Sequence, residues 1–88
     1  MAVDRSLLEE FCGRALDRLA ELINAHQARG RSKTDWIEMG IDGNLDHLVD
    51  HFEKYDSGAQ SHEYDLLNLA CRGMFALELD LREKEGKK

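Results

Sequence analysis

The fold is decided by residues 61–84, which read SHEYDLLNLACRGMFALELDLREK. No proline interrupts this stretch, and its apolar side chains recur every three or four residues, as in an α-helix. One line along the helix holds Tyr64, Leu67, Cys71 and Met74, and others hold Leu66, Leu69, Ala70, Leu77 and Leu81. These lines cover well over half of the circumference, whereas a surface helix needs an apolar stripe only about 100° wide. We therefore predict a central helix that is covered on two or more sides, in part by another copy of the molecule.

The composition predicts one small all-α domain. The chain has 88 residues, no proline, seven glycines and 34% charged residues, which suits a helical bundle and argues against an all-β chain. It lacks an apolar run of the roughly 20 residues that span a membrane, and its first residues do not resemble a signal peptide. We therefore expect a cytoplasmic protein.

The predicted layout is a bundle of three main helices and one short turn, completed by oligomerisation. The segments are a helix over 4–27, a basic loop and short turn over 28–43, a helix over 44–57, and the central helix over 61–84. Gly30 is expected to stop the first helix in the left-handed conformation. Thr34 starts and Gly40 stops the short turn, Asn44 caps the next helix, and Gly58 ends it.

The first helix should bury one face, and both cysteines should be buried. Its predicted buried stripe holds Leu8, Phe11, Cys12, Ala15, Leu19, Leu22 and Ile23. Cys12 and Cys71 are then small buried apolar residues in a reducing compartment. A disulfide or a reactive thiol is the alternative.

One basic segment stands out in an acidic chain. The net charge of −6 argues against general nucleic-acid binding, which needs a basic face, but an acidic surface could meet a basic protein patch. Arg29, Arg31 and Lys33 lie within five residues. They form either a solvated loop whose charges favour the helix C-terminus or a clamp for a phosphate-bearing ligand.

Four residues are candidate ligands for magnesium or manganese. His47 and His51 lie four residues apart on one helical face, Asp50 lies on the adjacent face, and Asp65 starts the antiparallel partner helix. A site needs three or more convergent ligands, and the alternative is a solvated acidic face. Such a site would support a metal-dependent nucleotide pyrophosphatase, although no Gly-rich phosphate loop or nucleophilic serine signature is present.

Asp65 and Asn68 are polar residues among the leucines of the central helix. One interpretation is local: the Asp65 carboxylate interacts favourably with the helix dipole, and Asn68 forms a hydrogen bond within its own helix. The functional interpretation is a polar pocket between helices, lined by these two residues and His51 and floored by Trp36.

Residues 30–80 resemble the small phage-borne domain named after the N-terminal region of dATP/dGTP diphosphohydrolases. The resemblance runs through Asp35-Trp36, Leu45-Asp46, His51, the stretch 65–71 and the stretch 75–79, with matches at Trp36, His51, Cys71 and Glu78. Asp50 stands where that group has an arginine, and Asp65 and Asn68 stand where it has histidines. The resemblance implies an all-helical phage or prophage accessory protein of nucleotide-related ancestry whose nucleotide chemistry is lost or changed. A phage-encoded protein of this kind would act in the host cytoplasm.

We therefore expect a homo-oligomeric accessory protein that works by binding. It would sequester a nucleotide or a nucleotide-derived signal, or block a basic host protein such as a nucleic-acid-binding defence effector. The expected ligand-binding residues are Arg29, Arg31, Lys33, Trp36, His51, Asp65 and Asn68. The alternatives are the metal-dependent pyrophosphatase and a purely structural oligomerisation module.

Overall fold

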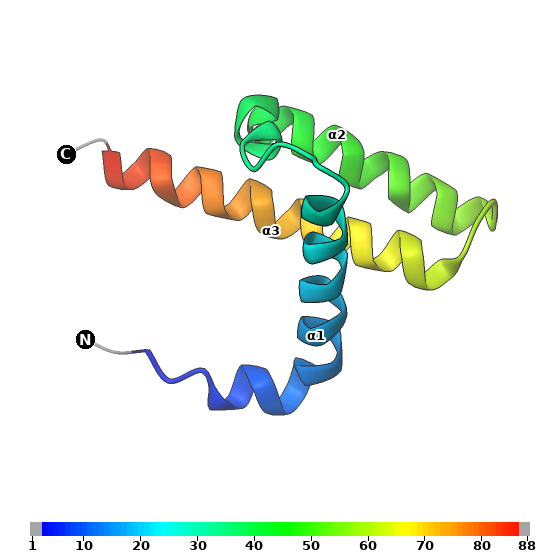
Figure 1. Ribbon diagram of the computed structural model, residues 1–88, viewed down its shortest axis with the longest axis horizontal. Coiled ribbons are helices and arrows are strands. Elements are labelled where there is room, and N and C mark those ends of the chain that lie inside the picture. Colours follow the sequence, from blue (N-terminus) through cyan, green and yellow to red (C-terminus); the bar gives the residue numbers. More distant parts are fainter. Residues whose placement is uncertain (1–2, 87–88) are drawn as a thin grey trace.

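The computed structural model describes residues 3–86, which form three α-helices (Figure 1). They are α1 (Ser6–Ala28), α2 (Asp35–Ser57) and α3 (His62–Gly86). Helices α2 and α3 lie side by side and antiparallel, and we call this pair the hairpin. Helix α1 crosses α3 steeply and projects from the hairpin. The predicted all-α architecture is thereby confirmed, and none of the helices within residues 3–86 is long and apolar enough to cross a membrane.

Helix α1 begins later than predicted and is not straight. Its first residue is Ser6, whose backbone N–H donates to the Asp4 carboxylate over 2.9 Å, so Asp4 holds the helix start from two residues upstream. The helix breaks at Cys12, where φ is −129° and ψ is 24°. Beyond the break it continues to Ala28, and Gly30 follows with φ of 83°, the left-handed conformation predicted for it.

Helix α2 contains a second break, at Gly40. As predicted, a short helical turn precedes Gly40, but the next helical segment follows it at once. Asn44 therefore lies inside the helix, and the prediction that it caps that helix is wrong. Its side-chain amide instead donates to the carbonyls of Trp36 over 2.9 Å and of Gly40 over 2.8 Å. Asn44 thus ties the turn before the break to the helical segment that follows it.

Gly40 itself is expected to tolerate no side chain. Its φ of 74° and ψ of −179° fall in a region that is essentially restricted to glycine, and holding another residue there costs about 1–3 kcal/mol. Gly40→Ala should therefore lower the free energy of unfolding by about that amount in a urea titration. The matched control is Gly13→Ala, because a Cβ atom meets no neighbour at either glycine and Gly13 lacks a positive φ. That control should stabilise the chain by up to about 1 kcal/mol, and a similar loss in both variants would contradict the argument.

The turn between α2 and α3 follows the sequence closely. Gly58 ends α2 in the left-handed conformation, with φ of 70°, as predicted. Ser61 Oγ accepts a hydrogen bond from the N–H of Tyr64, so it caps α3, which begins at His62.

The interior of the hairpin is unusually polar. Among residues 3–86, the buried apolar residues are Cys71 and Ala76, whereas the buried polar ones are Asn44, His51, Asp65 and Asn68. The hairpin is therefore held together by specific hydrogen bonds as well as by apolar contact.

The predicted buried stripe of the first helix is wrong. Within Ser6–Ala28 no residue is buried, and Phe11 is 76% exposed. The reason is that α1 contacts the hairpin only through α3, so its end is half-covered at Leu19, Leu22 and Ile23, whereas its start, with Leu8 and Phe11, has no cover from the same chain. Cys12 is exposed as well, contrary to prediction, whereas Cys71 is buried as predicted.

The surface of α3 remains only partly covered within one chain. Leu66, Leu77 and Leu81 are exposed, with Leu77 at 58%. Helix α2 covers one side and the end of α1 another, which leaves a third apolar side open.

Candidate functional site

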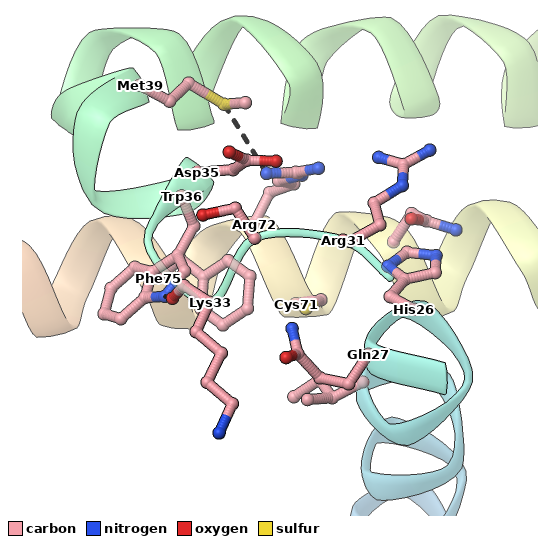
Figure 2. A pocket seen from close by; sticks show the side chains of 13 residues that line it. His26, Gln27, Arg31, Lys33, Asp35, Trp36, Met39, Cys71, Arg72 and Phe75 are labelled. Atoms are coloured by element: carbon pink, nitrogen blue, oxygen red, sulfur yellow. Dashed lines mark hydrogen bonds between the residues drawn. The ribbon is translucent and has the colours of Figure 1, made fainter. Parts of the chain in front are cut away.

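A cavity of about 380 Å³ lies where the end of α1, the loop that follows it, the first turns of α2 and the middle of α3 meet (Figure 2). It is lined by Ile23, His26, Gln27, Arg31, Ser32, Lys33, Asp35, Trp36, Met39, Asn68, Cys71, Arg72 and Phe75. Figure 2 shows His26 and Gln27 on α1 at one side, Trp36 and Phe75 at the other, and Cys71 on α3 between them. The volume is in the range of small-molecule sites.

Two stacked aromatic rings form one wall. The rings of Trp36 and Phe75 stack with 4.8 Å between their centroids and 30° between their planes. Trp36 Nε1 donates to the carbonyl of Lys33 over 2.9 Å, which fixes the indole against the loop. The Arg82 guanidinium lies 5.2 Å from the centre of the Trp36 ring. The wall is therefore a planar apolar surface held in place, of the kind that stacks against a flat ring.

The cavity is positively charged although the chain is acidic. Arg31, Lys33 and Arg72 line it, against a single carboxylate, that of Asp35. Burial lowers the pKa of His26, and the charges of Arg31, Arg29 and Arg72 lower it further. Burial is the larger cause of this shift, and the excess of cations among the lining side chains is what favours an anionic ligand.

Arg72 is the cation whose position is fixed by the fold. Its Nη1 donates to Asn44 Oδ1 over 3.1 Å and contacts Met39 Sδ at 3.5 Å. Its guanidinium lies 5.9 Å from the centre of the Phe75 ring. Since Asn44 is itself held by two backbone carbonyls at the Gly40 break, the break in α2 serves to orient a cation on α3.

Asn68 and Cys71 form the floor of the cavity. Asn68 Nδ2 donates to the carbonyl of Tyr64 over 2.9 Å, within its own helix. Burial raises the pKa of the Cys71 thiol, and the charge of Arg72 opposes that rise only in part. The thiol is therefore protonated at neutral pH and is a poor nucleophile.

A second polar cluster lies near the α2–α3 turn, away from the cavity lining. Asp65 Oδ1 accepts hydrogen bonds from His51 Nδ1, over 3.1 Å, and from Gln60 Nε2. Burial raises the pKa of the Asp65 carboxyl, but the hydrogen bonds from Gln60 and His51 lower it by more, so the net shift is downward. Asp65 is thus a carboxylate at neutral pH, and the cluster ties the two helices together.

This cluster predicts a loss of stability in acid. Because the pKa of Asp65 in the folded chain lies below its ordinary value of 3.8, the stabilisation is fully present above that value and is lost as the pH falls through the folded pKa. Thermal melts of the wild type and Asp65→Asn should therefore differ most near neutral pH and converge only as the pH falls below the lowered folded pKa of Asp65. The control Asp56→Asn alters an exposed carboxylate of the same hairpin. Melting curves of Asp65→Asn that stay a constant distance below the wild type at all pH values would contradict this account.

Part of the predicted binding set meets in the cavity. Arg31, Lys33, Trp36 and Asn68 line it, whereas Arg29, His51 and Asp65 do not. Arg29 stands beside the cavity and acts on His26 only through its charge. The other two belong to the cluster at the turn.

Nine of the thirteen lining residues were not among the predicted binding residues. Three of these nine supply a basic or aromatic group to the site: His26, Arg72 and Phe75. A signal for two of them exists, because Asn68, Arg72 and Phe75 are four and three residues apart and share one face of a helix. His26 carried no such signal, since nothing in its local pattern distinguishes it from a solvated residue at the end of a helix.

The four candidate metal ligands are not brought together. Asp50 pairs with Lys54 at 3.0 Å, and His51 pairs with Asp65. The hydrogen bond from Lys54 is the main cause of the lowered pKa of Asp50. In the chain from residue 3 to residue 86, no group of three or more His, Cys, Asp or Glu side chains is placed to hold a metal ion.

The fold and the cavity together define a class: an all-α protein with one aromatic-walled, positively charged cavity between its three helices. Comparison of the chain with protein-family models, curated proteins and solved structures found no match.

Proposed function

We propose that this protein binds a small nucleotide-like anion in the cavity and acts by sequestering it. The observation that carries the proposal is the meeting of a stacked Trp36–Phe75 wall with Arg31, Lys33 and Arg72 in one cavity of about 380 Å³. Aromatic faces stack on bases, and cations bind phosphates, so these two kinds of lining suit the two ends of a nucleotide. The resemblance of residues 30–80 to a nucleotide-related group supports the same class.

The test uses the single tryptophan of the chain as its probe. Trp36 is the only tryptophan and lines the cavity, so its fluorescence reports on occupancy. We expect dATP and dGTP to quench it with saturation and to raise the melting temperature. Inorganic phosphate and deoxyadenosine alone should act far more weakly. If no compound of this set changes the fluorescence at millimolar concentration, the proposal fails.

Alanine variants of the basic loop compare two lining residues with one neighbour that does not line the cavity. Arg31→Ala and Lys33→Ala remove charges that line the cavity, whereas Arg29→Ala removes a charge from the same loop without removing a lining residue. Each lining variant should weaken nucleotide binding about tenfold or more, as the loss of a charge-assisted hydrogen bond does. The Arg29 variant should change it little. Equal effects from all three would indicate general charge attraction rather than a site.

The same samples separate binding from turnover. Incubation with dATP and magnesium or manganese, followed by an assay for pyrophosphate, tests the metal-dependent pyrophosphatase directly. Saturable binding without pyrophosphate supports the sequestering role. Turnover that disappears in His51→Ala would instead show that the protein is a metal-dependent pyrophosphatase, and the sequestering role would be abandoned.

We further propose that the protein works as a homo-oligomer. The open apolar side of α3, with Leu66, Leu77 and Leu81, and the uncovered α1 support this. Light scattering behind size exclusion tests it, and a chain that remains a single copy at all concentrations would overturn it.

A further inference from the structure

Helix α1 begins with an uncovered arm. We define the arm as residues 6–20, which project from the hairpin in Figure 1. Leu7, Leu8 and Phe11 are all exposed on it, ahead of the break at Cys12. Three large apolar side chains within five residues are more than a solvated helix end needs, and such grouping marks a contact surface.

The hairpin carries a second uncovered apolar surface. On α2, Leu45 and Phe52 lie on one line with Leu48, and on α3, Leu66 and Leu77 lie on one line with Gly73. A Cβ atom placed on Gly73 would lie 3.5 Å from Leu48 Cδ1, so the two lines adjoin on one side of the hairpin. We call this the hairpin face, and its exposed members are Leu45, Val49, Phe52, Leu66, Leu77 and Leu81.

The hairpin face looks away from the cavity. On α3 the cavity is lined by Asn68, Cys71 and Phe75. At 100° per residue, Leu66 and Leu77 stand about 120° to 180° around the helix from these lining residues. The hairpin face therefore remains free when α1 and the loop close the cavity on the other side.

The surface area that one chain exposes exceeds that of a monomer by about the area that a dimer interface buries. The chain exposes 6890 Å², whereas a folded monomer of its mass, 10.1 kDa, exposes roughly 5,300 Å². The excess is about 1,600 Å² per chain, or about 3,200 Å² for two chains, which is within the range of obligate homodimer interfaces. A second copy of this chain is thus sufficient to cover what one copy leaves open.

Charge decides which surfaces meet. The hairpin helices hold thirteen Asp and Glu against four Lys and Arg, whereas the arm, residues 6–20, holds three Asp and Glu against two Lys and Arg. Two hairpin faces packed on each other would bring like charges together, which is unfavourable. The arm is nearly neutral by comparison, so it can pack on an acidic partner surface with far less repulsion than a second hairpin face.

We propose that the protein forms a homodimer in which the arm of each copy packs on the hairpin face of the other. Arm and face are then buried reciprocally, and each copy contributes one of each. The exchange also holds α1 against the hairpin of its own chain. There the C-terminal end of α1 supplies Ile23, His26 and Gln27 to the cavity. This last consequence rests on the proposed function, but the dimer is tested without any ligand.

A complementation experiment tests the exchange on the full chain. Phe11→Glu damages the arm and Phe52→Glu damages the hairpin face, and both side chains are exposed in the single chain. Each variant alone should raise the dimer dissociation constant about 30-fold or more, measured by analytical ultracentrifugation. An equimolar mixture should recover dimers, because one arm and one face remain intact in the heterodimer. The control Asn24→Glu adds the same charge at an exposed position on α1 beyond the arm and should leave the dimer unchanged.

Three results would overturn the proposal: a wild type that stays monomeric, a dimer that Phe52→Glu breaks while Phe11→Glu does not, and a mixture that fails to recover dimers. If the variants lose helicity, a cross-linking experiment replaces them. Cys12 is an exposed thiol adjacent to Phe11, and Cys71 is buried. Val49→Cys should then form a disulfide-linked dimer under mild oxidation that disappears when Cys12→Ser is added. Persistence of that dimer without Cys12 would also count against the exchange.

Discussion

Replacing Asn44 with alanine is expected to lower the free energy of unfolding by about 2–5 kcal/mol. The side chain is fully buried, and its amide donates to the carbonyls of Trp36 and Gly40 while its oxygen accepts from Arg72. Alanine leaves two part-buried carbonyls and one guanidinium without that partner, and each such group costs up to about 1–3 kcal/mol when it stays unsatisfied. Urea unfolding followed by circular dichroism at 222 nm, the usual helix signal, measures the loss.

Two further variants make the result specific. Asn24→Ala removes the same amide from an exposed position on α1 and should change stability by no more than about 0.5 kcal/mol. Asn44→Asp keeps an acceptor for Arg72 but places a carboxylate against two carbonyls, so it should be at least as destabilising as Asn44→Ala. If Asn44→Ala behaved like Asn24→Ala, the break at Gly40 would not depend on this side chain.

The role of Asn44 shows where sequence reasoning stops. An asparagine that follows Asp42-Gly43 and precedes an apolar run has the local pattern of a helix cap. Its actual partners include Arg72, which is 28 residues away and reaches it only after α2 and α3 have paired. The left-handed glycines at 30, 40 and 58, by contrast, are local requirements, and the sequence predicted each as a stop.

Helical periodicity shows that a face is apolar but not what covers it. The stripe through Leu8 and Phe11 was correctly seen as apolar and wrongly expected to be buried within the chain. The same reasoning applied to residues 61–84 predicted that one copy could not cover them, and the single chain does leave Leu77 more than half exposed. Burial depends on elements that come together in space, and here part of the cover is proposed to come from a second copy.

The candidate site was predictable only where a local cause set it. Arg31 and Lys33 reach the cavity, whereas Arg29 of the same loop does not line it, because the left-handed turn at Gly30 redirects the chain between them. From the sequence alone, the three basic residues of the loop are equivalent, so it could not be predicted which of them line the cavity. Phe75 lay among many apolar residues of α3, and only its stack on Trp36 distinguishes it.

The largest expected effect on binding comes from Arg72. Its guanidinium is already fixed by Asn44, Met39 and Phe75 in the absence of a ligand, so binding orders it at little further cost. Arg72→Met keeps an unbranched side chain and removes the charge. We expect the dissociation constant for dATP to rise about 10- to 100-fold, as follows from losing about 1.5–3 kcal/mol in a charge-assisted hydrogen bond.

Arg82→Met is the matched control for this prediction. Arg82 lies on the same helix and over the ring of Trp36, but it pairs with Glu78 and does not line the cavity. Arg72→Lys should bind with intermediate affinity, because lysine keeps the charge but lacks the planar fork that grips a phosphate. Circular dichroism must show that each variant remains helical, since Arg72→Met also leaves Asn44 Oδ1 without its donor. If Arg72→Met and Arg82→Met weakened binding equally, the effect would come from the overall charge of α3, and the cavity would lose its fixed cation as the basis of recognition.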